Sequence, residues 1–103
     1  WGAQIHDAVK PQAGEPVLVK RRINPFTIPH LRKELQGKET LLLAGVATNF
    51  VVEECARTAT ALDYEVMVLE DCCASMNQQM HEFPIKNILP NLVTVTTSKE
   101  ITF

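Results

Sequence analysis

Basic residues capable of chemistry gather in one part of the chain. Lys20, Arg21 and Arg22 are consecutive, and six of the ten basic residues lie between Lys20 and Lys38. Such a cationic run at a strand end can attract an anionic or carbonyl-bearing substrate. A solvated basic loop also accounts for the same residues, because charge runs usually form solvated faces.

Residues 45–52 connect an expected buried strand to an expected helix, and such a junction leaves backbone N–H groups free to bind an oxyanion. A cysteine thiolate would suit this place, because a helix N-terminus and a nearby lysine both lower a thiol pKa. The residue found there is Val51. Cys55 lies one helical turn later on the apolar stripe, where we expect an inert, packed thiol.

The other cysteines and the histidines do not suggest a site of their own. Cys72 and Cys73 are adjacent and poorly placed to bridge each other, so we expect free thiols. No further Cys or His has the spacing of soft-metal ligands, and we expect no metal. His6, His30 and His81 fall in separate helical patterns, where surface or packing roles are expected. No glycine-rich phosphate loop is present, and we expect no cofactor.

Alternating apolar runs and helical patterns predict the elements that position these residues. Near-continuous apolar strands with intervening helices are typical of βαβ units with a parallel sheet covered on both faces. The sequence therefore predicts a three-layer αβα fold with a Rossmann-like parallel sheet. The four expected strands are Pro16–Lys20, Thr40–Gly45, Glu65–Leu69 and Leu92–Thr96.

Helical periodicity predicts three helices between these strands and a fourth before them. Thr48 is a suitable N-cap for the clearest of them, and Pro84 should kink or divide another. Ligands of open parallel sheets bind beyond the carboxyl ends of the strands, so we expect Lys20 and residues 47–51 to face one pocket. The expected helices are Ile28–Gln36, Asn49–Leu62, Ser75–Leu89 and Ala3–Val9.

Length and charge exclude several classes of protein. A chain of 103 residues is the size of a single domain, and we place no boundary within residues 1–103. The net charge of −2 and the pI near 5.9 give no field that would recruit nucleic acid or an anionic membrane. Without a membrane-spanning apolar run or a signal-peptide pattern, we expect a soluble, cytoplasmic protein.

Two stretches of the chain resemble a known family. The run KRRINPF, Lys20–Phe26, resembles its K-x-x-x-S-A-F segment. The run LLLAGVATNFVVEECARTATALDYEVMVLEDC, Leu41–Cys72, resembles its G-V-x-T-N-x-C-V-x-x-T-A-x-x-A stretch, and His81 and a VTVT strand complete the order. Through these residues the chain resembles the isochorismatase-like cysteine hydrolases, which include nicotinamidases, N-carbamoylsarcosine amidases and isochorismatases.

This resemblance implies hydrolysis of an amide or related bond by an Asp, Lys and Cys triad, usually in an oligomer. Lys20 matches the family's catalytic lysine, which would polarise the nucleophile and stabilise transition-state charge. Val46–Ala47 matches a non-proline cis peptide of the family, so Val46, Ala47 and Thr48 would form the oxyanion region. The residues that would line or border the substrate pocket are Phe26, Asn49 and Phe50.

The chain departs from this pattern at two places. Val51 stands at the nucleophile position, and its isopropyl group has neither a proton to give nor a lone pair, so cysteine amidase activity is not expected. Isochorismatases of the family can hydrolyse an enol ether without the cysteine, but they use an aspartate on the family's first strand. Nothing before Val17 matches that strand, and Asp7 is a poor substitute. We expect four of six strands to be visible, with the N-terminal strands lacking.

Three hypotheses of function follow. The first is a hydrolase-family domain acting on a small amide or enol-ether substrate, non-standard because of Val51. The second is a catalytically inactive family member that serves as a binding or assembly subunit. The third is an unrelated small α/β domain that docks a protein partner through Lys20, Arg21 and Arg22. A homo-oligomer is expected under the family resemblance.

Overall fold

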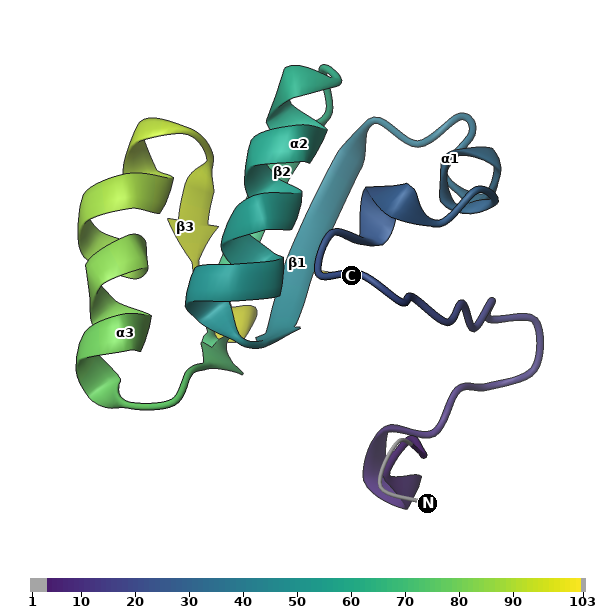
Figure 1. The fold of residues 1–103 in the computed structure, drawn as a ribbon, viewed down its shortest axis with the longest axis horizontal. Helices are drawn as coiled ribbons and strands as arrows, with labels where there is room; N and C mark the ends of the chain where they lie inside the picture. Colours follow the sequence, from purple (N-terminus) through teal and green to yellow (C-terminus); the bar gives the residue numbers. More distant parts are fainter. Residues whose placement is uncertain (1–3, 103) are drawn as a thin grey trace.

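The structure, a computed structural model, describes residues 4–102. A three-stranded sheet carries helices beside it, and residues 4–22 extend away from that body as a long irregular segment (Figure 1). The strands are β1 (Thr40–Val46), β2 (Glu65–Ala74) and β3 (Thr94–Thr96). The helices are α1 (Leu31–Glu34), α2 (Glu53–Ala61) and α3 (Gln78–Phe83), with 3-10 turns η1 (Asp7–Val9), η2 (Pro25–Thr27), η5 (Leu89–Asn91) and η6 (Ser98–Glu100) and π-helical turns η3 (Thr48–Val52) and η4 (Pro84–Ile88).

The sheet is parallel throughout, with the strands in the order β1, β2, β3, which confirms the predicted α/β class. Leu43 pairs with Val68, but the next pairing joins Gly45 to Cys73, two residues later on β1 and five later on β2. This bulge lengthens β2 beyond the expected Glu65–Leu69 strand, because the extra residues loop out before pairing resumes.

The core lies between the sheet and the helical segments beside it, which are η3 and α2 after β1 and η4 and η5 before β3. Alternate residues of β1, Leu41 and Leu43, pack against it, while Leu42 and Val46 on the other side of the strand are exposed. Leu89 is the largest of the fully buried side chains. The buried core residues are Val52, Ala56, Ala59, Val66, Val68, Ile85 and Leu89.

The expected strand at Pro16–Lys20 is wrong, because the structure shows irregular chain there. Val17 and Val19 are 54% and 80% exposed, and the segment pairs with none of the described strands. A strand is stabilised by hydrogen bonds to a neighbour and by burial of its side chains, and this segment has neither among residues 4–102. The strand propensity of residues 16–20 alone is therefore not enough to form a strand.

Prolines explain where the observed helices differ from the expected ones. Pro29 lacks an N–H and disfavours helix at the residue before it, so α1 begins only at Leu31 and the expected Ile28–Gln36 helix shortens to one turn. At Pro84 the helix changes from α3, which ends at Phe83, to the π-helical η4, and the helical backbone continues through this point instead of dividing. Asn77, whose side chain accepts a hydrogen bond from the Met80 N–H, caps α3.

The expected helix from Asn49 to Leu62 is found as η3 followed by α2. Thr48 was wrong as its N-cap, because Thr48 is the first residue of η3 and its hydroxyl bonds elsewhere. Of the expected Ala3–Val9 helix, Ala3 lies outside the described residues, and the rest contains only the short turn η1. None of the described helices has the length and apolar character of a membrane span.

Candidate functional site at the end of β1

The chain changes direction sharply between β1 and η3. Gly45 has φ of +132°, which side chains rarely tolerate, and the Val46–Ala47 peptide bond is cis. Val46 is 73% exposed, whereas Thr48, two residues later, is completely buried. The turn thus carries the chain from the exposed end of the strand into the base of the helix.

Thr48 is anchored by a residue distant in sequence. Its hydroxyl oxygen lies 2.6 Å from Nδ1 of His81, which belongs to α3. A buried hydroxyl without a partner is costly, and His81 is the side chain that satisfies this one. The imidazole therefore ties α3 to the first residue of η3.

Asn49 is anchored in the same way by the connection between β2 and α3. Its side-chain oxygen accepts a hydrogen bond from the Ser75 hydroxyl. Two consecutive residues after Ala47 are therefore each held by a side chain from the next strand–helix unit. This double anchoring fixes the direction in which the start of η3 points.

The start of η3 presents backbone donors. Phe50 and Val52 donate their N–H groups to the Ala47 carbonyl, both at 3.2 Å. Within residues 4–102, the N–H groups of Thr48 and Asn49 donate to no protein acceptor. Unpaired donors at the beginning of a helix can bind a carbonyl oxygen or an anion. Because Thr48 is completely buried, only the N–H group of Asn49 is open to such a ligand.

A shallow hollow of about 260 Å³ lies beside this turn. Asn49 and Phe50 line it together with Ile23, which follows the basic run by one residue. Arg57 and Glu53 form an ion pair of 3.3 Å at its wall. The hollow thus joins the turn after β1 to the segment that carries Lys20.

Lys20 itself is exposed and makes no ion pair within the described part of the chain. The expectation that Lys20 faces the same pocket as residues 47–51 stays a prediction. The nearby Asn24 does hold this segment against the body, since its Nδ2 donates to the Thr58 hydroxyl of α2 over 2.8 Å. The segment is therefore attached to the helix that begins at the candidate site.

Phe26 lies on the core side of this segment. It packs against the buried cluster and against Tyr64, with ring centroids 6.2 Å apart. Its backbone N–H donates to Asn24 Oδ1. The structure thus gives Phe26 an anchoring role, and the substrate contact expected for it stays a prediction.

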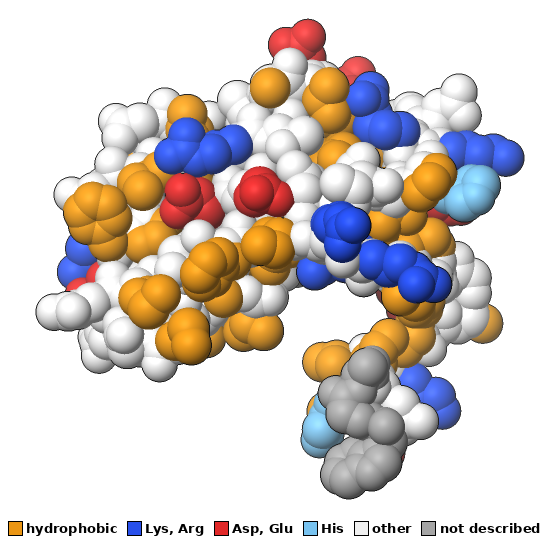
Figure 2. Space-filling view, in the orientation of Figure 1, with side chains coloured by type: hydrophobic (Ala, Val, Ile, Leu, Met, Phe, Trp, Pro, Cys, Tyr) orange, Lys and Arg blue, Asp and Glu red, His pale blue; other side chains and the backbone are white. Residues whose placement is uncertain are grey.

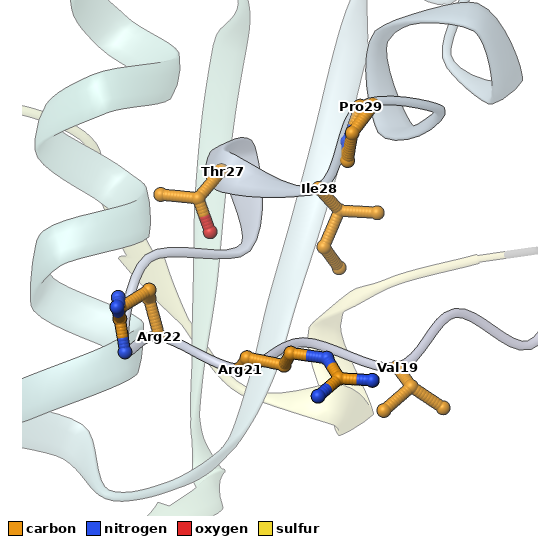
Figure 3. Close-up of a pocket in the computed structure, with 6 residues that line it drawn as sticks. All are labelled: Val19, Arg21, Arg22, Thr27, Ile28 and Pro29. Carbon is orange, nitrogen blue, oxygen red and sulfur yellow. The ribbon is translucent and has the colours of Figure 1, made fainter.

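A second cavity, of about 350 Å³, lies along the basic segment (Figure 3). Val19, Arg21 and Arg22 form one side of it, and residues 27–29 form the other. The two arginine side chains point away from each other, Arg22 toward the left of the view and Arg21 toward Val19 (Figure 3). On the face drawn in Figure 2, several Lys and Arg side chains lie over α1 and the chain before it, and others lie elsewhere on the surface. Lys20, Arg21 and Arg22 are exposed, as a solvated basic loop would be.

None of the residues near η3 supplies an activated thiol. Val51 is half-buried against the core. Cys55 is buried, and burial raises the pKa of its thiol to about 11, so the thiol stays protonated at neutral pH. Burial also raises the pKa of Cys73, and only Cys72 is exposed. No group of three or more His, Cys, Asp or Glu side chains placed to hold a metal ion occurs in the described range.

Comparisons with known proteins show the family to which this fold belongs. The isochorismatase domain family matches residues 1–100. The chain belongs to the isochorismatase family. An isochorismatase-like hydrolase from Alkaliphilus metalliredigens is 34% identical and superposes with a TM-score of 0.91 over 97% of this chain and 56% of its own.

Curated members of the family have a comparable sequence identity to this chain. An uncharacterized isochorismatase family protein of Escherichia coli, YecD, is 31% identical over 86 residues, which are 82% of this chain and 46% of that protein. The ureidoacrylate amidohydrolase RutB of Yersinia enterocolitica is 33% identical over 96 residues, 91% of this chain and 40% of that protein. The chain spans about half the length of the curated relatives it matches. It has an isochorismatase-family hydrolase fold.

The sequence did not indicate the pairing of Thr48 with His81 or of Asn49 with Ser75. Thr48 and His81 are 33 residues apart, and Asn49 and Ser75 are 26 apart. A surface or packing role was expected for His81. A usable signal was present, since both partners follow the strand that neighbours β1, and the carboxyl ends of adjacent parallel strands meet at one edge.

Proposed function

We propose that this protein is a hydrolase acting on a small amide or enol-ether substrate at the turn between β1 and η3. The observation that carries the proposal is the free backbone N–H group of Asn49 beside the hollow, in a turn that the Ser75 bond to Asn49 and the His81 bond to Thr48 hold in direction. Donors aimed where negative charge develops stabilise a transition state without reorganising. The amidohydrolase name of RutB supports the amide class.

Under this proposal, water attacks the substrate directly. Val51 offers no nucleophile, and the Cys55 thiol, with its pKa of about 11, cannot replace one. Lys20 would place its ammonium near the developing charge, from a segment that Asn24 fastens to α2. The family's aspartate has no match in these 103 residues, so turnover further requires a carboxylate delivered to the site from beyond them.

A screen for hydrolysis tests the proposal. The full natural protein, with the carboxylate that these 103 residues lack, is incubated with a panel of small primary amides, carbamoyl compounds and enol ethers, and released ammonia or carbonyl product is measured. We expect slow turnover by the wild type. Lys20→Ala should reduce the rate at least tenfold, because it removes the charge near the developing anion. Val51→Ala should keep the rate within threefold of the wild type, because no bond to residue 51 forms. Lys38→Ala, which removes an exposed lysine at the opposite end of β1, is the matched control and should leave the rate unchanged.

A second candidate function is a catalytically inactive subunit that binds a small molecule or assists assembly, and Val51 at the nucleophile position favours it. This second hypothesis predicts that substrate-like amides bind and raise the melting temperature of the protein. It also predicts that neither the wild type nor Val51→Cys forms product. Product formed by the wild type contradicts it. A cytoplasmic homo-oligomer belongs to both proposals, and sedimentation velocity would measure the oligomeric state.

A further inference from the structure

The contact between Thr48 and His81 joins the candidate site to a part of the molecule that does not line it. Thr48 begins η3, and His81 lies in the middle of α3. The separation of 2.6 Å between the Thr48 hydroxyl oxygen and Nδ1 is that of a strong hydrogen bond. Either the hydroxyl donates to the neutral ring, or Nδ1–H donates to the hydroxyl.

Thr48 has no exposed surface, so water cannot replace this partner. His81 is half-buried and can reach solvent with the rest of its ring. Without this bond the buried Thr48 hydroxyl would have no hydrogen-bond partner, whereas His81, which is only half-buried, could bond to water instead. A bond of this kind restrains the buried turn far more than the helix that supplies it.

The packing of α3 does not depend on the imidazole. The segment after α3 is held in the core by Ile85 and Leu89, and Asn77 caps the helix through the Met80 N–H. Removing the ring would leave these contacts in place. The effect of the change should therefore concentrate at η3.

We propose that His81 is a positioning residue for the candidate site, which it serves by holding the buried Thr48 so that the N–H group of the next residue, Asn49, keeps one direction. The inference rests on the proposed function for its effect on turnover, but the positioning itself is a property of the free protein. Ser75 supports the same turn through Asn49. Donors held in place before substrate arrives are those that lower a barrier most.

The test uses variants that separate the bond from the bulk of the ring. His81→Asn can place an amide atom close to the position of Nδ1 and keep the hydrogen bond, whereas His81→Leu cannot. His30→Asn is the matched control, because His30 is exposed and its side chain makes no cap bond at α1. Amide hydrogen exchange is followed by NMR for Phe50 and Val52, whose N–H groups bond to Ala47.

We expect His81→Leu to speed exchange at Phe50 and Val52 at least tenfold, while amides of the paired residues Val66 and Val68 change less than twofold. His81→Asn should restore most of the protection, and the His30 control should match the wild type. Equal exchange in wild type and His81→Leu overturns the proposal. So does a uniform rise across the sheet, because that result shows a purely structural role.

Kinetics on the best substrate of the panel add a second readout. Loss of positioned donors should lower kcat about tenfold for His81→Leu and leave KM within about twofold, with rescue by His81→Asn. Equal losses in the Leu and Asn variants overturn the proposal. Should the wild type turn over no substrate, the proposed function fails, and the exchange experiment still decides the role of His81.

Discussion

Two apolar runs of this chain resemble each other in composition and differ in what surrounds them. In β1, Leu41 and Leu43 pack on the core and the strand pairs with β2. In residues 16–20, Val17 and Val19 are exposed and the backbone pairs with no described strand. The segment stands off the body in Figures 1 and 2. The contrast teaches that β-branched residues permit a strand, and a paired, covering neighbour is needed to form one.

Proteolysis should give the largest difference between the two regions. Trypsin can cut after Lys20, Arg21 or Arg22 in irregular chain, whereas cleavage after Arg57 requires α2 to open. With a local opening free energy of about 3 kcal/mol for the helix, the cleavage rates should differ by roughly a hundredfold. Mass spectrometry of timed digests measures this ratio, and comparable rates at the two places would remove the distinction between the regions.

Truncating one core residue should come next. Leu89→Ala deletes a completely buried side chain and should lower the free energy of unfolding by about 3 kcal/mol. Val19→Ala, at an 80% exposed position, should change it by less than about 0.5 kcal/mol. Urea denaturation measures both values. A loss above about 1 kcal/mol for Val19→Ala would indicate that residues 16–20 are packed in solution.

A helix cap should have an intermediate effect. Asn77→Ala removes the acceptor of the Met80 N–H and should cost about 1 kcal/mol. Asn24→Ala removes a similar Asx contact to the Phe26 N–H but also the bond to Thr58, so it should loosen the basic segment as well. Thermal unfolding compares the two variants. Faster trypsin cleavage after Arg22 in Asn24→Ala, absent in Asn77→Ala, would sharpen the comparison.

The smallest effect concerns pH. Hydrogen bonds from the Ser98 hydroxyl and N–H hold the pKa of Asp71 below its usual value of 3.8. Because the folded-state pKa is the lower one, this contact contributes stability above pH 4, and the contribution is lost as the pH falls through the depressed pKa. Asp71→Asn should therefore lose less stability than the wild type between pH 5 and pH 2.

The exposure of Asp71 limits the size of this effect. The melting temperatures of wild type and Asp71→Asn should differ by less than about 2 °C at pH 6 and converge in acid. Ser98→Ala should weaken the pH dependence only in part, since it removes the hydroxyl donor and leaves the Ser98 N–H donating to Asp71. Divergence of the curves toward low pH would refute the assignment.

The sequence predicted the elements that local pattern controls. The apolar stripe from Val52 to Ala59 predicted the helix that is found as η3 and α2, and Pro84 marked the point where α3 changes to η4. The sequence could not show which apolar run pairs with a neighbouring strand, because Pro16–Lys20 and β1 have similar composition. The place of the candidate site stays a prediction, and the anchoring of Thr48 by His81 was not foreseen, since it depends on how two strand–helix units meet in space.

The three cysteines have a practical consequence for spectroscopy. Burial raises the thiol pKa of Cys55 and of Cys73, and Cys55 is the more deeply buried of the two. Cys72 is exposed near the end of β2. A maleimide dye or nitroxide added at neutral pH should therefore couple at Cys72 first. The natural sequence then carries a reporter one residue from Asp71, at the edge of the sheet where β1 turns into η3. Distances from such a label would report contacts between copies of the chain without any substitution.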